Sequence, residues 1–182
     1  MIWGLAYTVC VAVLMVRVRT PDAPPPRPVL PAPDEPLWLT RVHHALFLCL
    51  LAGAPLERLF LAGAARGRAA GALLFAGGVL LYRVAGRALG EALSPFVEPR
   101  PGAPLVTRGP YRYLRHPMYV SEAMIALGAP LTLGSLHVVW LAVPAALVLL
   151  IRILREEEAL ARTFPEYPRY AARTKRIFPF LY

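Results

Sequence analysis

The sequence predicts an all-α integral membrane protein of about five transmembrane helices. Hydrophobic residues make up 57% of its 182 residues and charged residues only 17%, which is more apolar surface than a soluble core of this length can bury. Five apolar segments are long enough to cross or nearly cross a bilayer, which takes roughly 17–25 helical residues. They lie at residues 1–16, 37–54, 69–84, 118–133 and 136–154.

The first apolar segment, residues 1–16, is expected to be a retained membrane anchor. A secretory signal peptide starts with basic residues and ends at a small-residue cleavage site. Here no basic residue precedes the apolar stretch, and Arg17 and Arg19 follow it directly. Prolines then crowd residues 21–36. Because proline lacks an N–H and restricts φ, this stretch is expected to be an extended spacer.

The third apolar segment is expected to pack at the centre of the bundle, because small residues let helices approach closely in lipid. Its small residues are Gly71, Ala72, Ala76, Gly77 and Gly78. The segments 118–133 and 136–154 are separated by too few residues for anything but a tight antiparallel hairpin. The chain is therefore expected to be one membrane domain, with helices and linker in residues 1–84 and the functional core in residues 85–182.

The basic composition indicates membrane topology rather than nucleic-acid binding. Lys and Arg total 20 against 11 Asp and Glu, a formal net charge of +9. These residues lie between apolar segments, where basic side chains mark cytoplasmic loops and meet anionic lipid headgroups. The arginine-rich stretches 85–117 and 152–176 are expected to face the cytoplasm, with the N-terminus outside. In a bacterial cell this means the inner (plasma) membrane, and no nucleic-acid partner is expected.

The two cysteines indicate neither a metal centre nor a disulfide framework. Cys10 and Cys49 lie singly in separate apolar segments, where a thiol packs as a small hydrophobic side chain. No metal site is expected from the sequence.

Ionisable and aromatic residues gather in the two stretches assigned to the cytoplasm. Residues 107–119 hold three tyrosines, three arginines and a histidine, and they lead into the fourth apolar segment at Pro117. Proline suits the first turn of a helix, whose free N–H groups favour a carboxylate or phosphate. In the second stretch, Arg152 and Glu156 are spaced to pair on one helix face. The aromatic and basic residues 164–179 are expected to lie at the membrane interface and cap a pocket.

Each of these features also has a purely structural explanation. Arginines near a cytoplasmic helix end and tyrosines in an interfacial belt are common membrane anchors. His116 can serve as a helix cap. His43 and His44 are expected at the interface of the second segment and His137 at the outer turn, without a catalytic role. Spacing alone therefore predicts a polar pocket on the cytoplasmic face, of unspecified chemistry.

The combination of motifs is more specific than its parts. The run from Gly109 to Tyr119, which contains Arg115-His116-Pro117-Met118-Tyr119, resembles the Arg-His-Pro-x-Tyr signature of the isoprenylcysteine carboxyl methyltransferase and phospholipid methyltransferase superfamily. Glu156-Glu157 is similar to the second, Glu-Glu motif of that superfamily. The resemblance covers roughly residues 89–182. Ser121 and Pro165 stand where the family usually has glycine.

The resemblance implies S-adenosylmethionine as methyl donor, held in a cytoplasmic pocket formed by the C-terminal half of the chain. It implies contacts of the cofactor carboxylate with Arg115, His116 and the start of the fourth helix, and of its ammonium or ribose diol with a Glu-Glu carboxylate. The expected cofactor-binding residues are Tyr111, His116, Pro117, Tyr119, Glu156, Glu157 and Tyr170. The expected catalytic residues are Arg115, Glu157 and Arg173.

The expected acceptor is a membrane-embedded, lipid-like molecule, with the carboxylate of an isoprenylcysteine-type substrate as the first candidate. A phospholipid amine is the alternative, and it would need a general base such as Glu122 or Glu157. A membrane reductase using a nicotinamide dinucleotide and a non-enzymatic membrane scaffold remain further alternatives. Membrane lipids are the other partners that the sequence predicts.

Overall fold

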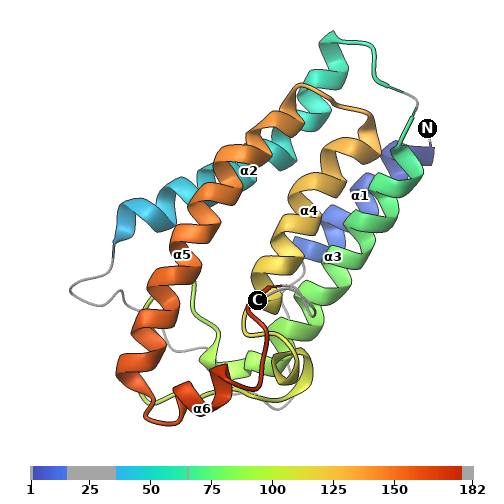
Figure 1. The fold of residues 1–182 in the computed structure, drawn as a ribbon. Coiled ribbons are helices and arrows are strands. Elements are labelled where there is room, and N and C mark those ends of the chain that lie inside the picture. Colours follow the sequence, from blue (N-terminus) through green and yellow to red (C-terminus); the bar gives the residue numbers. More distant parts are fainter. Residues whose placement is uncertain (1, 16–35, 65, 178–182) are drawn as a thin grey trace.

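The computed structural model describes residues 2–15, 36–64 and 66–177, which form a helical bundle (Figure 1). No strand occurs in these ranges. The α-helices are α1 (Ile2–Met15), α2 (Leu37–Phe60), α3 (Arg68–Leu89), α4 (Pro117–Leu133), α5 (Ala142–Thr163) and the short α6 (Tyr167–Ala171). Three 3-10 turns join them, η1 (Gly90–Ala92), η2 (Gly109–Arg112) and η3 (Val138–Leu141). Residues 21–35 of the proline-rich spacer and residues 178–179 of the expected tail lie outside the described residues.

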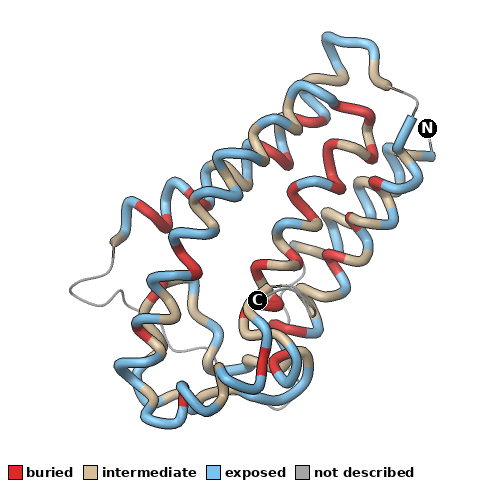
Figure 2. The backbone as a smooth tube through the Cα atoms, in the orientation of Figure 1, coloured by how far each residue is buried: buried red, intermediate tan, exposed pale blue. Residues whose placement is uncertain are grey.

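The predicted class, an all-α integral membrane protein, is confirmed. Within the described ranges, three helices are long and apolar enough to cross a membrane, at Leu37–Phe60, Arg68–Ala92 and Val138–Thr163. Helix α1 is a shorter apolar helix, and α4 has 17 residues. Large apolar side chains point outward, as contact with lipid requires; Leu73 of α3 is 77% exposed and Leu147 of α5 is 60% exposed. Figure 2 shows exposed positions along the outer sides of α2 and α5 and many buried positions on α4.

Helix α3 packs against α4 along a seam of glycines. A Cβ at Gly128 of α4 would lie 2.4 Å from the backbone nitrogen of Phe75 in α3. A Cβ at Gly71 of α3 would lie 2.6 Å from the backbone nitrogen of Thr132 in α4. Only glycine permits this approach, and the fully buried Phe75 ring fills the core beside it. The expected close packing of the third apolar segment is therefore seen, but its expected central position is wrong. Helix α3 packs chiefly on α4 and α1, whereas α4 contacts α1, α2, α3 and α5 and holds the centre.

Helices α4 and α5 are joined by a short turn, as the sequence predicts, and then diverge (Figure 1). Gly134 ends α4 in the left-handed region with φ of 73°, which a glycine adopts without strain. The Ser135 hydroxyl donates to the Ala54 carbonyl at 2.8 Å, and the Glu57 carboxylate accepts the Val138 N–H at 2.8 Å. Helix α2 thus holds this turn, which fixes the end where α4 and α5 are close.

Helix α5 continues well past its apolar segment. It runs to Thr163, so Glu156 and Glu157 lie inside the helix instead of at its end. Carboxylates in the last turn of a helix would oppose its dipole, and the longer helix removes that conflict. The polar half of α5 is therefore a regular helix that lies opposite the start of α4.

Candidate functional site

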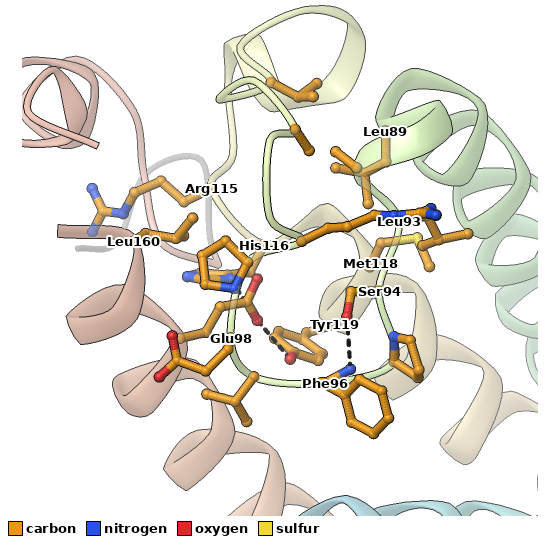
Figure 3. Close-up of a pocket in the computed structure, with 18 of the residues that line it drawn as sticks. Leu89, Leu93, Ser94, Phe96, Glu98, Arg115, His116, Met118, Tyr119 and Leu160 are labelled. Atoms are coloured by element: carbon orange, nitrogen blue, oxygen red, sulfur yellow. Dashed lines mark hydrogen bonds and ion pairs between the residues drawn. The ribbon is translucent and has the colours of Figure 1, made fainter. Parts of the chain in front are cut away.

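A cavity of about 380 Å³ lies where α4 and α5 have diverged (Figure 3). Its walls come from α2, α3, α4 and α5, and the loop 93–106 covers one side. The charged and imidazole side chains that line it are His43, His44, Glu98, Arg100, Arg115, His116, Glu122, Arg152 and Glu156. Tyr82, Tyr111, Tyr119 and Tyr170 add aromatic surface. The cavity therefore combines apolar walls with many ionisable groups, and such a concave site is the natural candidate for a small-molecule pocket.

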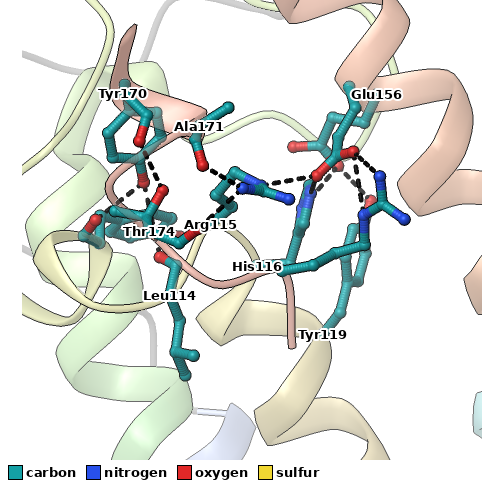
Figure 4. A network of polar contacts seen from close by, with 11 residues as sticks. Leu114, Arg115, His116, Tyr119, Glu156, Tyr170, Ala171 and Thr174 are labelled. Atoms are coloured by element: carbon teal, nitrogen blue, oxygen red, sulfur yellow. Dashed lines mark hydrogen bonds and ion pairs between the residues drawn. The ribbon is translucent and has the colours of Figure 1, made fainter. Parts of the chain in front are cut away.

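Beside this cavity, the Glu157 carboxylate contacts two arginines and a histidine, in the polar network in which Figure 4 labels Arg115 and His116. Its Oε1 accepts from Arg115 Nε at 2.8 Å and lies 3.2 Å from His116 Nε2. Its Oε2 accepts from Arg176 Nε at 3.0 Å. The Glu157 side chain is only 13% exposed, and it is not part of the cavity lining. Through these contacts, Glu157 connects the Arg-His-Pro motif with the tail.

The tail after α6 lies along the Arg-His-Pro segment. Arg115 donates from Nη1 to the carbonyl of Thr174 at 2.8 Å (Figure 4), and its backbone N–H donates to the carbonyl of Lys175 at 2.7 Å. Lys175 in turn donates its N–H to Tyr113 at 3.0 Å. Because these bonds use backbone groups, the tail is held in register against residues 113–116. Phe164 and Tyr170 of the expected tail line the cavity, whereas residues 171–177 do not, so the expectation that the tail caps the pocket stays a prediction.

Glu156, the other acidic residue of the Glu-Glu motif, faces the cavity. The Tyr119 hydroxyl donates to Glu156 Oε2 at 2.6 Å, and the Tyr119 ring stacks on His116 with centroids 5.6 Å apart. Arg152 does not pair directly with Glu156, as the helical spacing suggested. Its Nε lies 3.4 Å from the same Tyr119 oxygen, so the tyrosine mediates between the two.

Arg152 is buried, with 3% exposure, and ties three elements together. Besides Tyr119 of α4, it donates to Thr40 Oγ1 of α2 at 2.8 Å and to the carbonyl of Pro95 in the covering loop at 2.9 Å. A buried guanidinium is costly unless its N–H groups are paired. The contacts therefore fix α2 and the loop relative to Tyr119, a role that no local sequence pattern indicates.

Tyr111 and Tyr170 form the aromatic end of the cavity. The Tyr170 hydroxyl donates to the Tyr111 carbonyl at 2.8 Å. Burial raises the pKa of Tyr170 to about 12, and burial together with the charge of Glu156 raises the pKa of Tyr111 as well. Both phenols are therefore neutral at physiological pH, which suits aromatic contact with a cation or a purine.

Helix α4 begins beside this cavity. Pro117 occupies its first turn, and His116 stands at the N-cap position without a side-chain hydrogen bond to the helix. His116 is 2% exposed, so the free N–H groups and positive dipole end of α4 lie beside a largely desolvated wall. An anionic group is the natural partner of such a helix start.

Three of the expected site residues, Pro117, Glu157 and Arg173, do not line the cavity. The Arg173 side chain is exposed, whereas Arg176, which the sequence reading did not single out, makes the ion pair with Glu157. Ser121 is buried, and its hydroxyl donates to the Met118 carbonyl at 2.5 Å within its own helix. Pro165 is exposed in the turn before α6. The two departures from the family pattern thus lie outside the lining.

Comparison with known proteins gives one family and two relatives. The model of the phospholipid methyltransferase family matches residues 67–167. The chain is 39% identical over 89 residues to the nickel-cobalt-cadmium resistance protein NccN of Alcaligenes xylosoxydans xylosoxydans, covering 46% of this chain and 40% of that protein. It is 40% identical over 85 residues to the cobalt-zinc-cadmium resistance protein CzcN of Cupriavidus metallidurans, covering 46% of this chain and 39% of that protein. The similarity thus spans well under half the length of these relatives.

Proposed function

The chain belongs to the phospholipid methyltransferase family, a family of membrane methyltransferases, and we propose that it transfers a methyl group from S-adenosylmethionine to a lipid-like acceptor in the membrane. One observation supports this most directly. Glu156 and Tyr119, one from each family-like motif, are hydrogen-bonded to each other at the wall of the cavity. Two motifs far apart in the chain therefore supply one ligand-sized site.

The residues present fit this cofactor. The cavity of about 380 Å³ is within the range of roughly 300–1,000 Å³ typical of small-molecule pockets. The Glu156 carboxylate suits the ammonium group or the ribose diol, and the start of α4 with His116 suits the carboxylate. The neutral Tyr111 and Tyr170 rings suit the adenine or the sulfonium.

We propose different roles for the two acidic residues of the second motif. Both oxygens of Glu157 already contact cationic side chains of the protein. Glu157 would therefore position Arg115, His116 and Arg176 without contacting the cofactor itself. Glu156, which lines the cavity and contacts Tyr119, would bind the cofactor.

Positioning and exclusion of water would supply most of the rate. When bound, the cofactor supplies an activated methyl group that needs no further acid catalysis to leave. The chain then has to hold the acceptor in line with it, and a closed, dry site favours that approach. The loop 93–106 and the tail along residues 113–116 would cover the site.

The acceptor would enter from the bilayer between helices. With the N-terminus outside and the C-terminus in the cytoplasm, the site would face the compartment that supplies the cofactor. Two acceptor classes suit the reaction, the carboxylate of an isoprenylcysteine-type lipid and the amine of a phospholipid. A nicotinamide-dependent reductase and a non-enzymatic scaffold are the competing readings.

Calorimetry on the detergent-purified chain tests the proposal. We expect saturable binding of S-adenosylmethionine to the wild type, at least about tenfold weaker binding to Glu156→Gln, and unchanged binding to Glu158→Gln. Glu158 is an exposed neighbour on the same helix and therefore a matched control. A folded wild-type sample that binds NADPH, or that binds neither compound, would contradict the proposal.

A further inference from the structure

The cavity contains a second polar pair that the proposed cofactor contacts do not use. His43 of α2 and Glu122 of α4 both line it, and His43 Nε2 lies 3.1 Å from Glu122 Oε2. His43 is 8% exposed and the Glu122 side chain 18%. From the sequence, His43 is expected at a helix interface without a catalytic role, and nothing local in the sequence pairs it with Glu122.

Tyr119 separates this pair from Glu156. Its hydroxyl points to Glu156, its ring face stacks on His116, and its ring meets the edge of His43 with centroids 6.4 Å apart. The cavity therefore has two halves, one with Glu156 and the motif residues, the other with His43 and Glu122. A transfer reaction needs such an arrangement, because donor and acceptor must lie on opposite sides of the group that moves.

Glu122 has hydrogen-bonding capacity to spare. Its Oε2 is buried, and although it lies close to His43, it receives no hydrogen bond of good geometry from the described residues. A buried carboxylate oxygen left in this state costs free energy, which a donor or cation entering the cavity would recover. The structure thus offers an acceptor-binding group of negative charge.

Arg152 would be the natural partner of an anionic acceptor, but its nitrogens are engaged. Nε, Nη1 and Nη2 point to Tyr119, Thr40 and Pro95 respectively. A carboxylate placed near Glu122 would meet a like charge, and the Arg152 fork would not be free to offset it. A cationic or proton-bearing nucleophile meets no such repulsion.

Resting on the proposed function, we propose that His43 and Glu122 form the acceptor site, bind an amine headgroup as its ammonium, and accept the proton that the nitrogen must lose. The ammonium gives one proton to Glu122, which exposes the nitrogen lone pair. The new C–N bond then forms as the methyl–sulfur bond breaks, and the electrons of that bond stay on sulfur as a thioether. The product is the methylated ammonium, and the proton on Glu122 leaves through His43 to water.

His43 lies in α2, outside the residues 67–167 that the family model matches. Apart from Tyr170, the donor half of the cavity is therefore built from the matched region, whereas part of the acceptor half is built from a helix outside it. This division gives the chain a means to select its acceptor without altering the donor half.

The first test measures binding without the cofactor. Calorimetry with dodecylamine and dodecanoate at neutral pH compares two probes that share a chain length and differ in charge. We expect the wild type to bind the amine at least about tenfold more tightly, and Glu122→Gln to lose that preference. Glu158→Gln is the matched control, because it makes the same change at an exposed position outside the cavity. Equal binding of both probes, or a preference that survives in Glu122→Gln, would overturn the proposal.

The second test separates this inference from the proposed function. Methyl transfer to phosphatidylethanolamine vesicles should fall about 100-fold or more in Glu122→Gln and less in His43→Gln, as expected for loss of a general base. Binding of S-adenosylmethionine should stay within twofold, and Glu122→Asp should restore part of the rate, which excludes a folding defect. Transfer to a farnesylcysteine carboxylate alone would overturn the amine site and leave the proposed function standing. Selective amine binding without binding of S-adenosylmethionine would overturn the proposed function and leave the amine site standing.

Discussion

The Tyr119 hydroxyl donates a 2.6 Å hydrogen bond to Glu156 Oε2, and this bond joins the Arg-His-Pro motif to the Glu-Glu motif inside the cavity. Tyr119 is 8% exposed, and Arg152 approaches the same oxygen at 3.4 Å. The oxygen therefore connects a carboxylate of α5 with a buried cation of the same helix.

Tyr119→Phe is expected to weaken cofactor binding. The substitution keeps the ring and removes the bond that orients Glu156, and a hydrogen bond to a charged group contributes about 1.5–3 kcal/mol, roughly tenfold or more in affinity. Calorimetry with S-adenosylmethionine measures the effect. Tyr113→Phe is the control, because Tyr113 is 65% exposed. An unchanged dissociation constant in Tyr119→Phe would show that Glu156 needs no such support.

Glu157→Gln is expected to lower the thermal stability of the purified chain. The change leaves Arg115 and Arg176 without their counter-charge beside a side chain that is 13% exposed, and breaking a buried pair costs about 3 kcal/mol. A thermal-shift measurement in detergent checks this, with Glu158→Gln as the exposed control. An unfolding midpoint equal to that of the wild type would contradict the role of Glu157 in holding Arg115 and Arg176 together.

Arg176 and Arg173 provide a paired comparison. Arg176→Gln removes an ion pair with Glu157 and is expected to loosen the tail, which should weaken S-adenosylmethionine binding several-fold and increase protease cleavage after residue 171. Arg173→Gln should change neither, because its side chain is exposed. Loss of methyl transfer in Arg173→Gln with intact binding would instead support the catalytic role that the family resemblance implies for it.

Gly128→Ala is expected to destabilise the bundle. The added Cβ would lie 2.4 Å from the Phe75 backbone nitrogen, and forced separation of packed helices costs about 1–3 kcal/mol. Gly86→Ala is the matched control, because a Cβ at Gly86 in α3 meets nothing within 4 Å and alanine favours a helix. The thermal unfolding midpoints of both variants, compared with that of the wild type, measure the effect. Equal midpoints would mean that α3 and α4 can move apart freely.

The family-like motifs could be found from the sequence because their residues are contiguous. Arg115, His116 and Pro117 form one run, and Glu156 and Glu157 another. The structure brings both runs to the same cavity. Sequence spacing could not distinguish Glu156 from Glu157, since adjacent helical residues point about 100° apart and only the packing of α5 decides which one faces the cavity.

Other assignments depended on contacts between distant residues. Arg176 rather than Arg173 reaches Glu157 because the tail pairs with residues 113–116 in one particular register. Arg152 was expected to pair with Glu156, but the Tyr119 hydroxyl stands between them. His43 was assigned no function because nothing near it in the chain suggests one.

The sequence alone determined the all-α membrane class, the approximate positions of the helices and the family, because hydropathy, helix length and contiguous motifs are properties of single segments. Only the tertiary structure decided which side chains meet. The divergence of α4 from α5, set by their tight turn and by the α3–α4 glycine seam, opens the cavity between them. The facing sides of four helices then determine that Glu156 lies on one side of Tyr119 and the His43–Glu122 pair on the other.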